Sequence, residues 1–320
     1  MRVLFMGYQV WGHSVLKALL ASRHDVPLII THPSSTHEYD NVWDGSVAKL
    51  ASDHHVPYLV RTRVNDDDCK AIISDIKPDI LVSSNWRTWI SPVICGLAKH
   101  GAINVHDGLL PRYGGFAPLN WALVNGEKEV GVTVHAMIEE LDLGPILLQE
   151  RIQVEPADNV ADLFHKTIPL FPRMILQALH LIERDQARWI EQDPRKATFF
   201  HKRSTEDSRI DWQHPANQIV NLIRAQADPY PNAFGYYRGQ PVKILKASVS
   251  ARRYGGTAGR IFCREGNGVV VVSGPHASTG EEFGTSLEWI RTADGCDVAA
   301  YDYFRRMGGY LTSYPESREA

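Results

Sequence analysis

Asn104 and His106 stand two residues apart at the end of the apolar run "GAINVH", which begins at Gly101. Residues two apart on a β-strand project to the same side, so both polar groups would face one space while Val105 faces the core. A histidine transfers protons near neutral pH, and an asparagine amide can donate to a carbonyl oxygen that gains negative charge. The pair is therefore a candidate for acyl-transfer chemistry; the alternative is two hydrogen-bonded structural groups at a strand end.

An acidic partner for this pair is available in the segment "IEELDLGPI". There Asp142 is followed closely by Gly144, which permits a tight turn that directs the carboxylate back into the cleft. Asp142 reaches His106 only if the strand expected at 131–138 packs beside the strand expected at 101–106. We therefore expect a cluster of amide, imidazole and carboxylate under that condition.

His135 and the cysteines are assigned structural roles. His135 lies within the alternating segment "VTVHAM" and is interpreted as a hydrogen-bonded strand histidine. No His, Cys or carboxylate spacing indicates a metal, and none is expected. The thiols form no CxxC pair and are interpreted as free; they are Cys69, Cys95, Cys263 and Cys296.

The segment "GYQVWG" ends the first expected strand and opens a helix. Gly7 and Gly12 do not complete the G-x-G-x-x-G pattern of a dinucleotide site, and Tyr8 and Trp11 would crowd a pyrophosphate. No acidic residue ends the second expected strand. The pattern favours a tight strand-to-helix turn over nicotinamide binding.

The first half of the chain alternates short apolar runs with amphipathic segments. We expect strands at 2–7, 26–32, 79–85 and 101–106, and helices at 14–22, 45–54 and 68–76. This alternation is typical of an α/β fold with a mostly parallel sheet covered on both faces. Ligands of such sheets bind beyond the carboxyl ends of the strands, where Asn85 and His106 lie.

The second half has a different pattern. Strands are expected at 131–138 and 146–154, a long helical stretch at 159–185 that prolines break, a helix at 216–226 and a closing helix at 298–309. Short strands separated by Gly-rich turns are expected at 233–239, 241–250, 259–263, 268–274 and 286–292. They predict a small C-terminal β-barrel. The predicted domains are a catalytic domain at 1–192, a linker at 193–209 and a β-rich domain at 210–320.

Composition limits the classes of protein. The 320 residues carry 34 Lys and Arg against 37 Asp and Glu, a net charge of −3, and 44% of them are hydrophobic. The missing basic excess disfavours a nucleic-acid partner. No apolar run approaches the roughly 18 residues of a membrane span, so no membrane partner is expected. These features predict a cytoplasmic enzyme.

Three segments together resemble a known family. "INVHDGLLP", "APLNWALVNGEKEVGVTVH" and "LDLGPILLQ" are similar to the formyltransferases that use N10-formyltetrahydrofolate. The similarity is greatest to the branch that formylates UDP-4-amino-4-deoxy-L-arabinose; methionyl-tRNA formyltransferases are also similar. The resemblance implies a Rossmann-like formyl-transfer domain followed by a small OB-like barrel, and a catalytic triad of Asn104, His106 and Asp142.

The resemblance also implies the binding residues. The co-substrate N10-formyltetrahydrofolate is expected at Trp86, Arg87, Thr88, Trp89, Ile90, Leu110, Ile138, Glu139, Glu140 and Leu141. The acceptor is expected at Tyr8, Trp11, Tyr113, Gly114, Gly115 and Phe116. From the residues alone, Glu139 and Glu140 are interpreted as a solvated face.

The loop after Leu-Leu-Pro departs from the family pattern. Relatives have an aromatic residue and Arg-Gly there, with a second basic position, whereas this chain has Gly114, Gly115 and Phe116. Asp107 also replaces the small residue that usually follows the histidine. The less charged loop suits an uncharged or aromatic acceptor, so the acceptor stays open between an amino-sugar nucleotide and a natural-product amine. Methionyl-tRNA formylation, formyltetrahydrofolate hydrolysis and a non-catalytic folate- or nucleotide-binding module are the alternatives.

Overall fold

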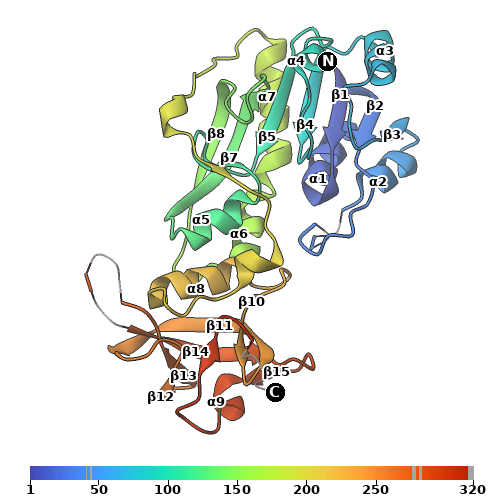
Figure 1. The fold of residues 1–320 in the computed structure, drawn as a ribbon. Coiled ribbons are helices and arrows are strands. Elements are labelled where there is room, and N and C mark those ends of the chain that lie inside the picture. Colours follow the sequence, from blue (N-terminus) through green and yellow to red (C-terminus); the bar gives the residue numbers. More distant parts are fainter. Residues whose placement is uncertain (41, 44, 276–278, 281–282, 316–320) are drawn as a thin grey trace. The chain divides into compact units, whose positions relative to one another are not determined.

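The structure is a computed structural model that describes all residues except 41, 44, 276–278, 281–282 and 316–320 (Figure 1). Its internal contacts divide the chain into two units. Unit 1 comprises Met1–Leu119, Lys128–Val154 and Leu163–Lys202, and unit 2 comprises Asn120–Glu127, Glu155–Asp162 and Arg203–Ala320. Each unit has its own hydrophobic core.

Unit 1 is built on a sheet with the strand order β3-β2-β1-β4-β5-β7-β8. Its strands are β1 (Arg2–Gly7), β2 (Asp25–Thr31), β3 (Tyr58–Val60), β4 (Ile80–Ser84), β5 (Ala102–His106), β7 (Glu129–Ala136) and β8 (Ile146–Gln153). The strands from β3 to β5 pair in parallel, and β7 and β8 pair antiparallel. The predicted mostly parallel sheet is therefore confirmed, and β3 is a strand that the sequence did not predict.

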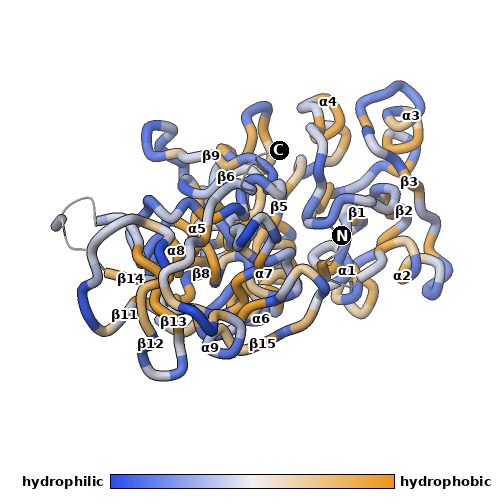
Figure 2. Tube along the Cα trace, turned by 60° about the horizontal axis from the view of Figure 1, so that its bottom comes forward, coloured by the Kyte–Doolittle hydropathy of each residue, from blue (hydrophilic) through white to orange (hydrophobic). Residues whose placement is uncertain are grey.

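Helices cover both faces of this sheet. The helices of unit 1 are α1 (Gln9–Leu20), α2 (Val47–Asp53), α3 (Asp67–Ile76), α4 (Pro92–Cys95) and α7 (Leu170–Glu183). Helices α5 (Pro118–Val124) and α6 (Val160–Thr167) have residues in both units, and α8 (Ala216–Ala225) and α9 (Ala300–Tyr303) belong to unit 2. Val3 and Phe5 of β1 pack with α1 and α7, whereas Leu4 and Met6 pack with α3 and α4. Alternate residues of one strand thus enter two cores, which explains the continuous apolar run. Figure 2 shows that α7, which packs on this sheet, is one of the hydrophobic segments of the chain.

The turn between β1 and α1 needs both of its glycines. A Cβ on Gly12 would lie 2.8 Å from the backbone of Gly7, so no side chain fits where the helix crosses the strand end. The helix starts at Gln9, earlier than the expected residue 14. The close approach supports the interpretation of this segment as a tight strand-to-helix turn.

The long helical stretch is interrupted at its first proline. Helix α6 ends at Thr167 and α7 begins at Leu170, with Pro169 between them, while Pro172 is accommodated in the first turn of α7. In the described part of the chain, no helix is long and apolar enough to cross a membrane.

Unit 2 contains an antiparallel sheet with the order β12-β13-β14-β11-β10-β16, and β15 pairs with β14. Its strands are β10 (Ala233–Tyr237), β11 (Gln240–Arg253), β12 (Ile261–Glu265), β13 (Gly268–Val272), β14 (Phe283–Arg291), β15 (Asp297–Ala299) and β16 (Leu311–Thr312). Backbone bonds from Leu311 to Gly259 and from Ile261 to Gly309 join the two edges of the sheet, as in a barrel. The β-rich second domain is confirmed, but the closing helix is limited to α9, because residues 297–299 pair as β15.

Candidate functional site

Strands β5 and β7 carry three polar side chains of the site. In their antiparallel register Asn104 is opposite His135 and His106 is opposite Thr133. This is the pairing on which the approach of Asp142 to His106 depended, since β7 leads directly into the turn that holds Asp142. The carboxyl end of β5 therefore collects the predicted amide and imidazole on one side.

His106 has a fixed proton arrangement. The ring is 8% exposed, and Nε2 lies 2.7 Å from the carbonyl oxygen of Tyr113. Because a carbonyl oxygen only accepts, Nε2 carries a proton. Nδ1 faces the Asp142 carboxylate at 3.9 Å, too far for a direct hydrogen bond. Nδ1 is therefore the ring nitrogen available to a reacting group.

Asp142 is held in a turn with unusual backbone geometry. Its φ is +54°, in the left-handed region, and Gly144 fits because a Cβ there would lie 1.8 Å from the carbonyl oxygen of Ala136. The backbone N–H of Gly115 donates to Asp142 Oδ2 at 2.8 Å. Burial favours protonation of this carboxyl, but the neighbouring histidines and that N–H together hold its pKa well below the usual range.

His135 belongs to the same cluster, although the sequence indicated only a structural role. The residue is 2% exposed; Nε2 lies 3.2 Å from Asn104 Nδ2 and 3.5 Å from Asp142 Oδ1, and Nδ1 donates to the Ala136 carbonyl oxygen at 2.8 Å. With the proton on Nδ1, Nε2 of the neutral ring accepts from the Asn104 amide. His135 thus sets which way that amide points.

The loop 113–116 is joined to a segment far along the chain. Strand β6 (Gly114–Gly115) pairs in parallel with β9 (Phe199–Phe200), and the rings of Tyr113 and Phe200 stack at 5.0 Å. A Cβ on Gly115, whose φ is +88°, would lie 2.4 Å from the Phe200 carbonyl oxygen. The glycines that depart from the family pattern are thus required by this pairing. Phe116 is 37% exposed at the end of the loop.

The two predicted folate loops touch each other. Trp89 Nε1 donates to the Glu139 carbonyl oxygen at 3.3 Å, which links the loop after β4 to the segment after β7. Trp89, Ile138 and Leu141 are exposed at 55%, 39% and 57%, so apolar side chains face solvent there. The other residues predicted to bind the formyl donor differ in exposure: Ile90 and Leu110 are buried, Trp86 and Arg87 are half-buried, and Glu140 is exposed. The Thr88 hydroxyl donates to the Thr62 carbonyl oxygen.

Tyr8 and Trp11, predicted to contact the acceptor, are engaged in internal contacts. The buried Tyr8 accepts at its hydroxyl from the backbone N–H of Ser35 at 3.0 Å. Trp11 Nε1 donates to Asp107 Oδ2 at 3.2 Å, on the side of β5 opposite to His106. Burial raises the pKa of Asp107 to about 6, because the hydrogen bond from Trp11 and the nearby His106 offset the burial only in part. Asp107 Oδ1 has no hydrogen-bond partner among the described residues.

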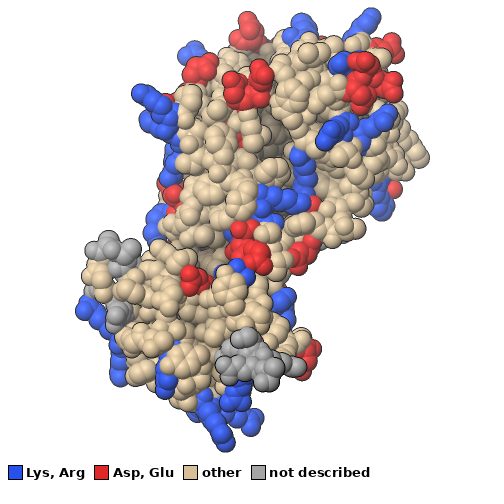
Figure 3. Space-filling view, in the orientation of Figure 1, with Lys and Arg blue, Asp and Glu red and all other residues tan. Residues whose placement is uncertain are grey.

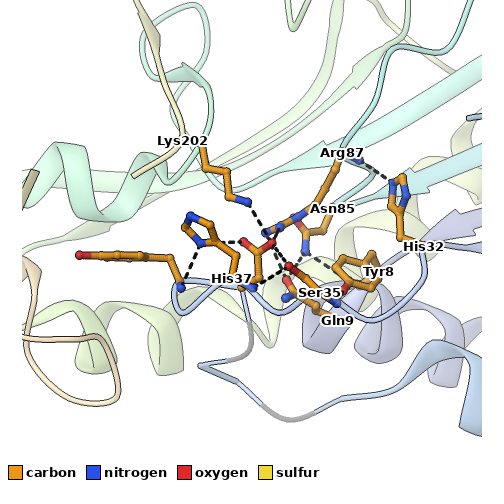
Figure 4. A network of polar contacts seen from close by, with 10 residues as sticks. Tyr8, Gln9, His32, Ser35, His37, Asn85, Arg87 and Lys202 are labelled. Carbon is orange, nitrogen blue, oxygen red and sulfur yellow. Dashed lines mark hydrogen bonds and ion pairs between the residues drawn. The ribbon is translucent and has the colours of Figure 1, made fainter. Parts of the chain in front are cut away.

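A second polar cluster lies where β1, β2 and β4 end (Figure 4). The Asp40 carboxylate, 4% exposed, pairs with Arg87 at 2.5 Å and Lys202 at 3.0 Å and accepts from Ser35 Oγ at 2.7 Å. Burial favours the protonated form, but Arg87, Ser35 and Lys202 lower the pKa of Asp40 to about 2. Asp40 therefore joins three segments as a permanent anion.

Arg87 connects this cluster to the start of helix α1 and to His32 after β2. Its guanidinium lies 3.4 Å from Gln9 Oε1, which also accepts from Asn85 Nδ2 at 3.1 Å, and its backbone N–H donates to His32 Nε2 at 3.1 Å. Burial and the nearby Arg87 charge lower the pKa of His32 to about 4, so this ring is a neutral acceptor. Gln9 Nε2 and Arg87 Nε are buried donors without a partner in the described part of the chain.

The comparison with known families decides the class. Residues 1–179 match the formyl transferase family, and residues 202–294 match the formyl transferase C-terminal domain. The chain belongs to the formyl transferase family. As a member of it, the protein is a one-carbon transferase. The residues matched include Asn104, His106 and Asp142.

Solved structures of similar fold include sugar formyltransferases. WlaRD, a sugar 3N-formyl transferase crystallised with dTDP and 5-N-formyl-THF, is 18% identical over 90% of this chain and 97% of its own, with a TM-score of 0.64. An N-formyltransferase from Helicobacter canadensis, in complex with folinic acid and dTDP-3-aminofucose, is 18% identical over 90% and 99%, with a TM-score of 0.64. HypX from Aquifex aeolicus, in complex with tetrahydrofolic acid, is 18% identical over 95% of this chain and 47% of its own, with a TM-score of 0.58. At this identity these similarities establish the fold.

Proposed function

We propose that this formyl transferase moves the formyl group of N10-formyltetrahydrofolate to a primary amine of a small molecule, giving an N-formyl product and tetrahydrofolate. The observation that carries the proposal is the convergence of the Asn104 amide, His106 Nδ1 and the Asp142 carboxylate on one sheet edge. Formyl transfer needs a hydrogen-bond donor to a developing oxyanion and an acceptor for the amine proton, and these groups supply both.

In the proposed mechanism the amine nitrogen attacks the formyl carbon and forms the new C–N bond. Asn104 and protonated His106 donate to the oxyanion of the tetrahedral intermediate, His106 through Nδ1 because Tyr113 holds Nε2. The Asp142 carboxylate, 3.9 Å from Nδ1, stabilises the charged imidazole and takes up the amine proton. The bond between the formyl carbon and N10 then breaks, N10 receives the proton that Asp142 took up, and tetrahydrofolate leaves.

The formyl donor is proposed to bind between the loop after β4 and the segment after β7. The contact of Trp89 with Glu139 and the exposed apolar side chains of Trp89, Ile138 and Leu141 support this site, because flat aromatic ligands bind apolar, partly preformed surfaces. Relatives of the same fold that were crystallised with folates support the same co-substrate. No metal is invoked in the reaction.

The acceptor proposed first is the amine of an amino-sugar nucleotide. Its support is the fold shared with sugar formyltransferases whose crystals contain dTDP or a dTDP-amino sugar. Gln9 Nε2 and Arg87 Nε add support, since unpartnered buried donors suit an anionic or hydroxyl-bearing ligand.

A small natural-product amine is the second candidate. The specific observation that favours it is the loop 113–116, which lacks the basic residues of relatives and has the apolar Phe116 at its exposed end. A tRNA acceptor is disfavoured by the net charge of −3. On the visible face, basic and acidic side chains are interspersed over the upper part of Figure 3.

The test is an absorbance assay for tetrahydrofolate with a panel of acceptors that contains amino-sugar nucleotides, small amines and tRNA. Tetrahydrofolate production only when an amine is added supports the proposal, and the amine that saturates at the lowest concentration identifies the acceptor class. Formate release without any amine would instead identify a hydrolase. A chain that binds folate and releases neither product would be a binding module.

A further inference from the structure

Residues 192–202, which we call the connecting segment, contact the turn of Asp142 and the loop 113–116, and reach the loop after β4 through Asp40. The segment contains a 3₁₀ turn, η1 (Pro194–Lys196), and the short strand β9. Its periodicity is too weak to predict structure, and most of its side chains are half-buried or exposed. Its contacts nevertheless fall on the groups that carry the chemistry.

The first contact holds the turn of Asp142. Gln192 Nε2 donates to the Asp142 carbonyl oxygen at 2.9 Å and to the Gly144 carbonyl oxygen at 2.7 Å. One side chain thus closes the turn in which Asp142 has its left-handed backbone. Because a residue other than glycine is costly in that region, the position of the carboxylate depends on such external support.

The second contact holds the carbonyl group that orients His106. Tyr113 N–H donates to Thr198 Oγ1 at 3.0 Å, and Gly114 N–H donates to the Thr198 carbonyl oxygen at 2.9 Å. These two bonds fix the peptide groups on both sides of Tyr113. The Tyr113 carbonyl oxygen in turn accepts from His106 Nε2. The Thr198 backbone holds the peptide group of the Tyr113 carbonyl, and the Thr198 hydroxyl holds the peptide group before it, so the Thr198 side chain acts on His106 through Tyr113.

The third contact reaches the loop after β4. Lys202 Nζ pairs with Asp40 at 3.0 Å, and Asp40 pairs with Arg87 (Figure 4). Arg87 belongs to the loop on which the formyl donor is proposed to bind. Lys202 thus acts on the binding loop, whereas Gln192 and Thr198 act on the reacting groups.

We propose that the connecting segment is a positioning element whose parts have separate kinetic roles: Gln192 and Thr198 set the rate of the chemical step, and Lys202 sets the affinity for the formyl donor. The proposal rests on the proposed function of the same site. It adds residues that no sequence motif indicated and assigns each one a measurable effect.

The test uses the full chain with Gln192→Ala, Thr198→Val and Lys202→Met, and Lys196→Met as the matched control. Lys196 is exposed in the same segment, and its side chain makes no hydrogen bond or ion pair with Gln192, Thr198, Lys202 or the residues they hold. We expect kcat to fall about 10-fold in Gln192→Ala and Thr198→Val with KM for the formyl donor within about twofold, since small misplacements of reacting groups slow the chemical step. Lys202→Met should raise KM about 5-fold and keep kcat. Thr198→Ser, which keeps the acceptor oxygen, should restore the parent kcat.

A readout independent of turnover accompanies the kinetics. Binding of 5-formyltetrahydrofolate by calorimetry should weaken in Lys202→Met alone, and the ¹⁵N resonances of the His106 ring should shift in Thr198→Val alone. Reduced thermal stability with unchanged kcat, KM, binding and resonances would overturn the proposal in favour of a purely structural segment. If the parent enzyme formylates no amine, the proposed function fails, while the binding and resonance patterns still decide the role of the segment.

Discussion

Asp142 and Asp40 are two buried aspartates of unit 1, 9% and 4% exposed, that are stabilised as anions in different ways. Asp142 faces two histidines and a backbone N–H, with no Arg or Lys paired to it among the described residues, whereas Asp40 pairs directly with Arg87 and Lys202 and has His37 at 3.9 Å. Histidines exchange protons near neutral pH, but arginine and lysine keep theirs. The first arrangement is therefore able to move a proton during a reaction, and the second is suited to fix loops.

The largest effect is expected when the cluster around Asp142 loses a hydrogen-bond donor to the oxyanion. Asn104→Ala should lower kcat about 10²–10³-fold, the usual value for one such donor, while the unfolding transition stays close to that of the parent. The control is Asn267→Ala, at an exposed turn residue of unit 2, which should retain full activity. If the Asn104→Ala enzyme were as active as the parent, the residues around Asp142 would have no catalytic role, and their contrast with the Asp40 cluster would be lost.

A substitution in the cluster around Asp40 should change the free energy of unfolding. Asp40→Asn leaves Arg87 and Lys202 without their carboxylate, and we expect the free energy of unfolding to fall by about 2 kcal/mol at pH 7. Since the folded-state pKa is about 2 against an ordinary 3.8, this contribution is complete above pH 3.8 and is lost as pH falls through 2. Urea denaturation at pH 7, and again near pH 2, measures both.

The matched control for Asp40 is Asp53, which pairs with Lys49 on an exposed helix face. Asp53→Asn should cost well under about 1 kcal/mol, the usual value of a surface pair. Equal losses for the two variants would mean that Asp40 contributes no more than a surface ion pair.

Asp107 extends the comparison to a third aspartate, for which burial outweighs the nearby His106 and the hydrogen bond from Trp11. Burial raises its pKa to about 6, so the ionised form is penalised in the fold: the penalty is absent below pH 3.8 and complete above pH 6. Asp107→Asn, which keeps an acceptor for Trp11, should therefore raise the free energy of unfolding by about 2 kcal/mol at pH 8 and leave it unchanged at pH 3.5. Asp75→Asn, at an exposed helix position, is the control and should show no such pH dependence. A stability gain that is the same at both pH values would contradict the assigned cause.

The sequence predicted the parts of the site that depend on one strand at a time. Asn104 and His106 face one side because of the alternation of β5 alone. The approach of Asp142 to His106 depends in addition on the pairing of β5 with β7, so the sequence predicted it only conditionally. The pairing of Gly114 with Phe199 could not be predicted, because a two-residue strand has no periodicity. The role of His135 was missed for a related reason: its neighbour across the sheet depends on a register that one strand does not encode.

The smallest predicted effect on kcat is that of substituting His135, which belongs to the cluster around Asp142. His135 Nε2 accepts from the Asn104 amide at 3.2 Å, and this bond holds the amide in one orientation. His135→Phe should lower kcat about 10-fold, whereas His135→Gln, which keeps an acceptor, should stay within about threefold of the parent. Steady-state kinetics of the two variants separate the explanations: if His135→Phe equals the parent in kcat, the orientation of Asn104 does not depend on this residue. The expected result, a low kcat in His135→Phe and a near-parent kcat in His135→Gln, would identify His135 as the residue that directs the Asn104 amide toward the formyl oxygen.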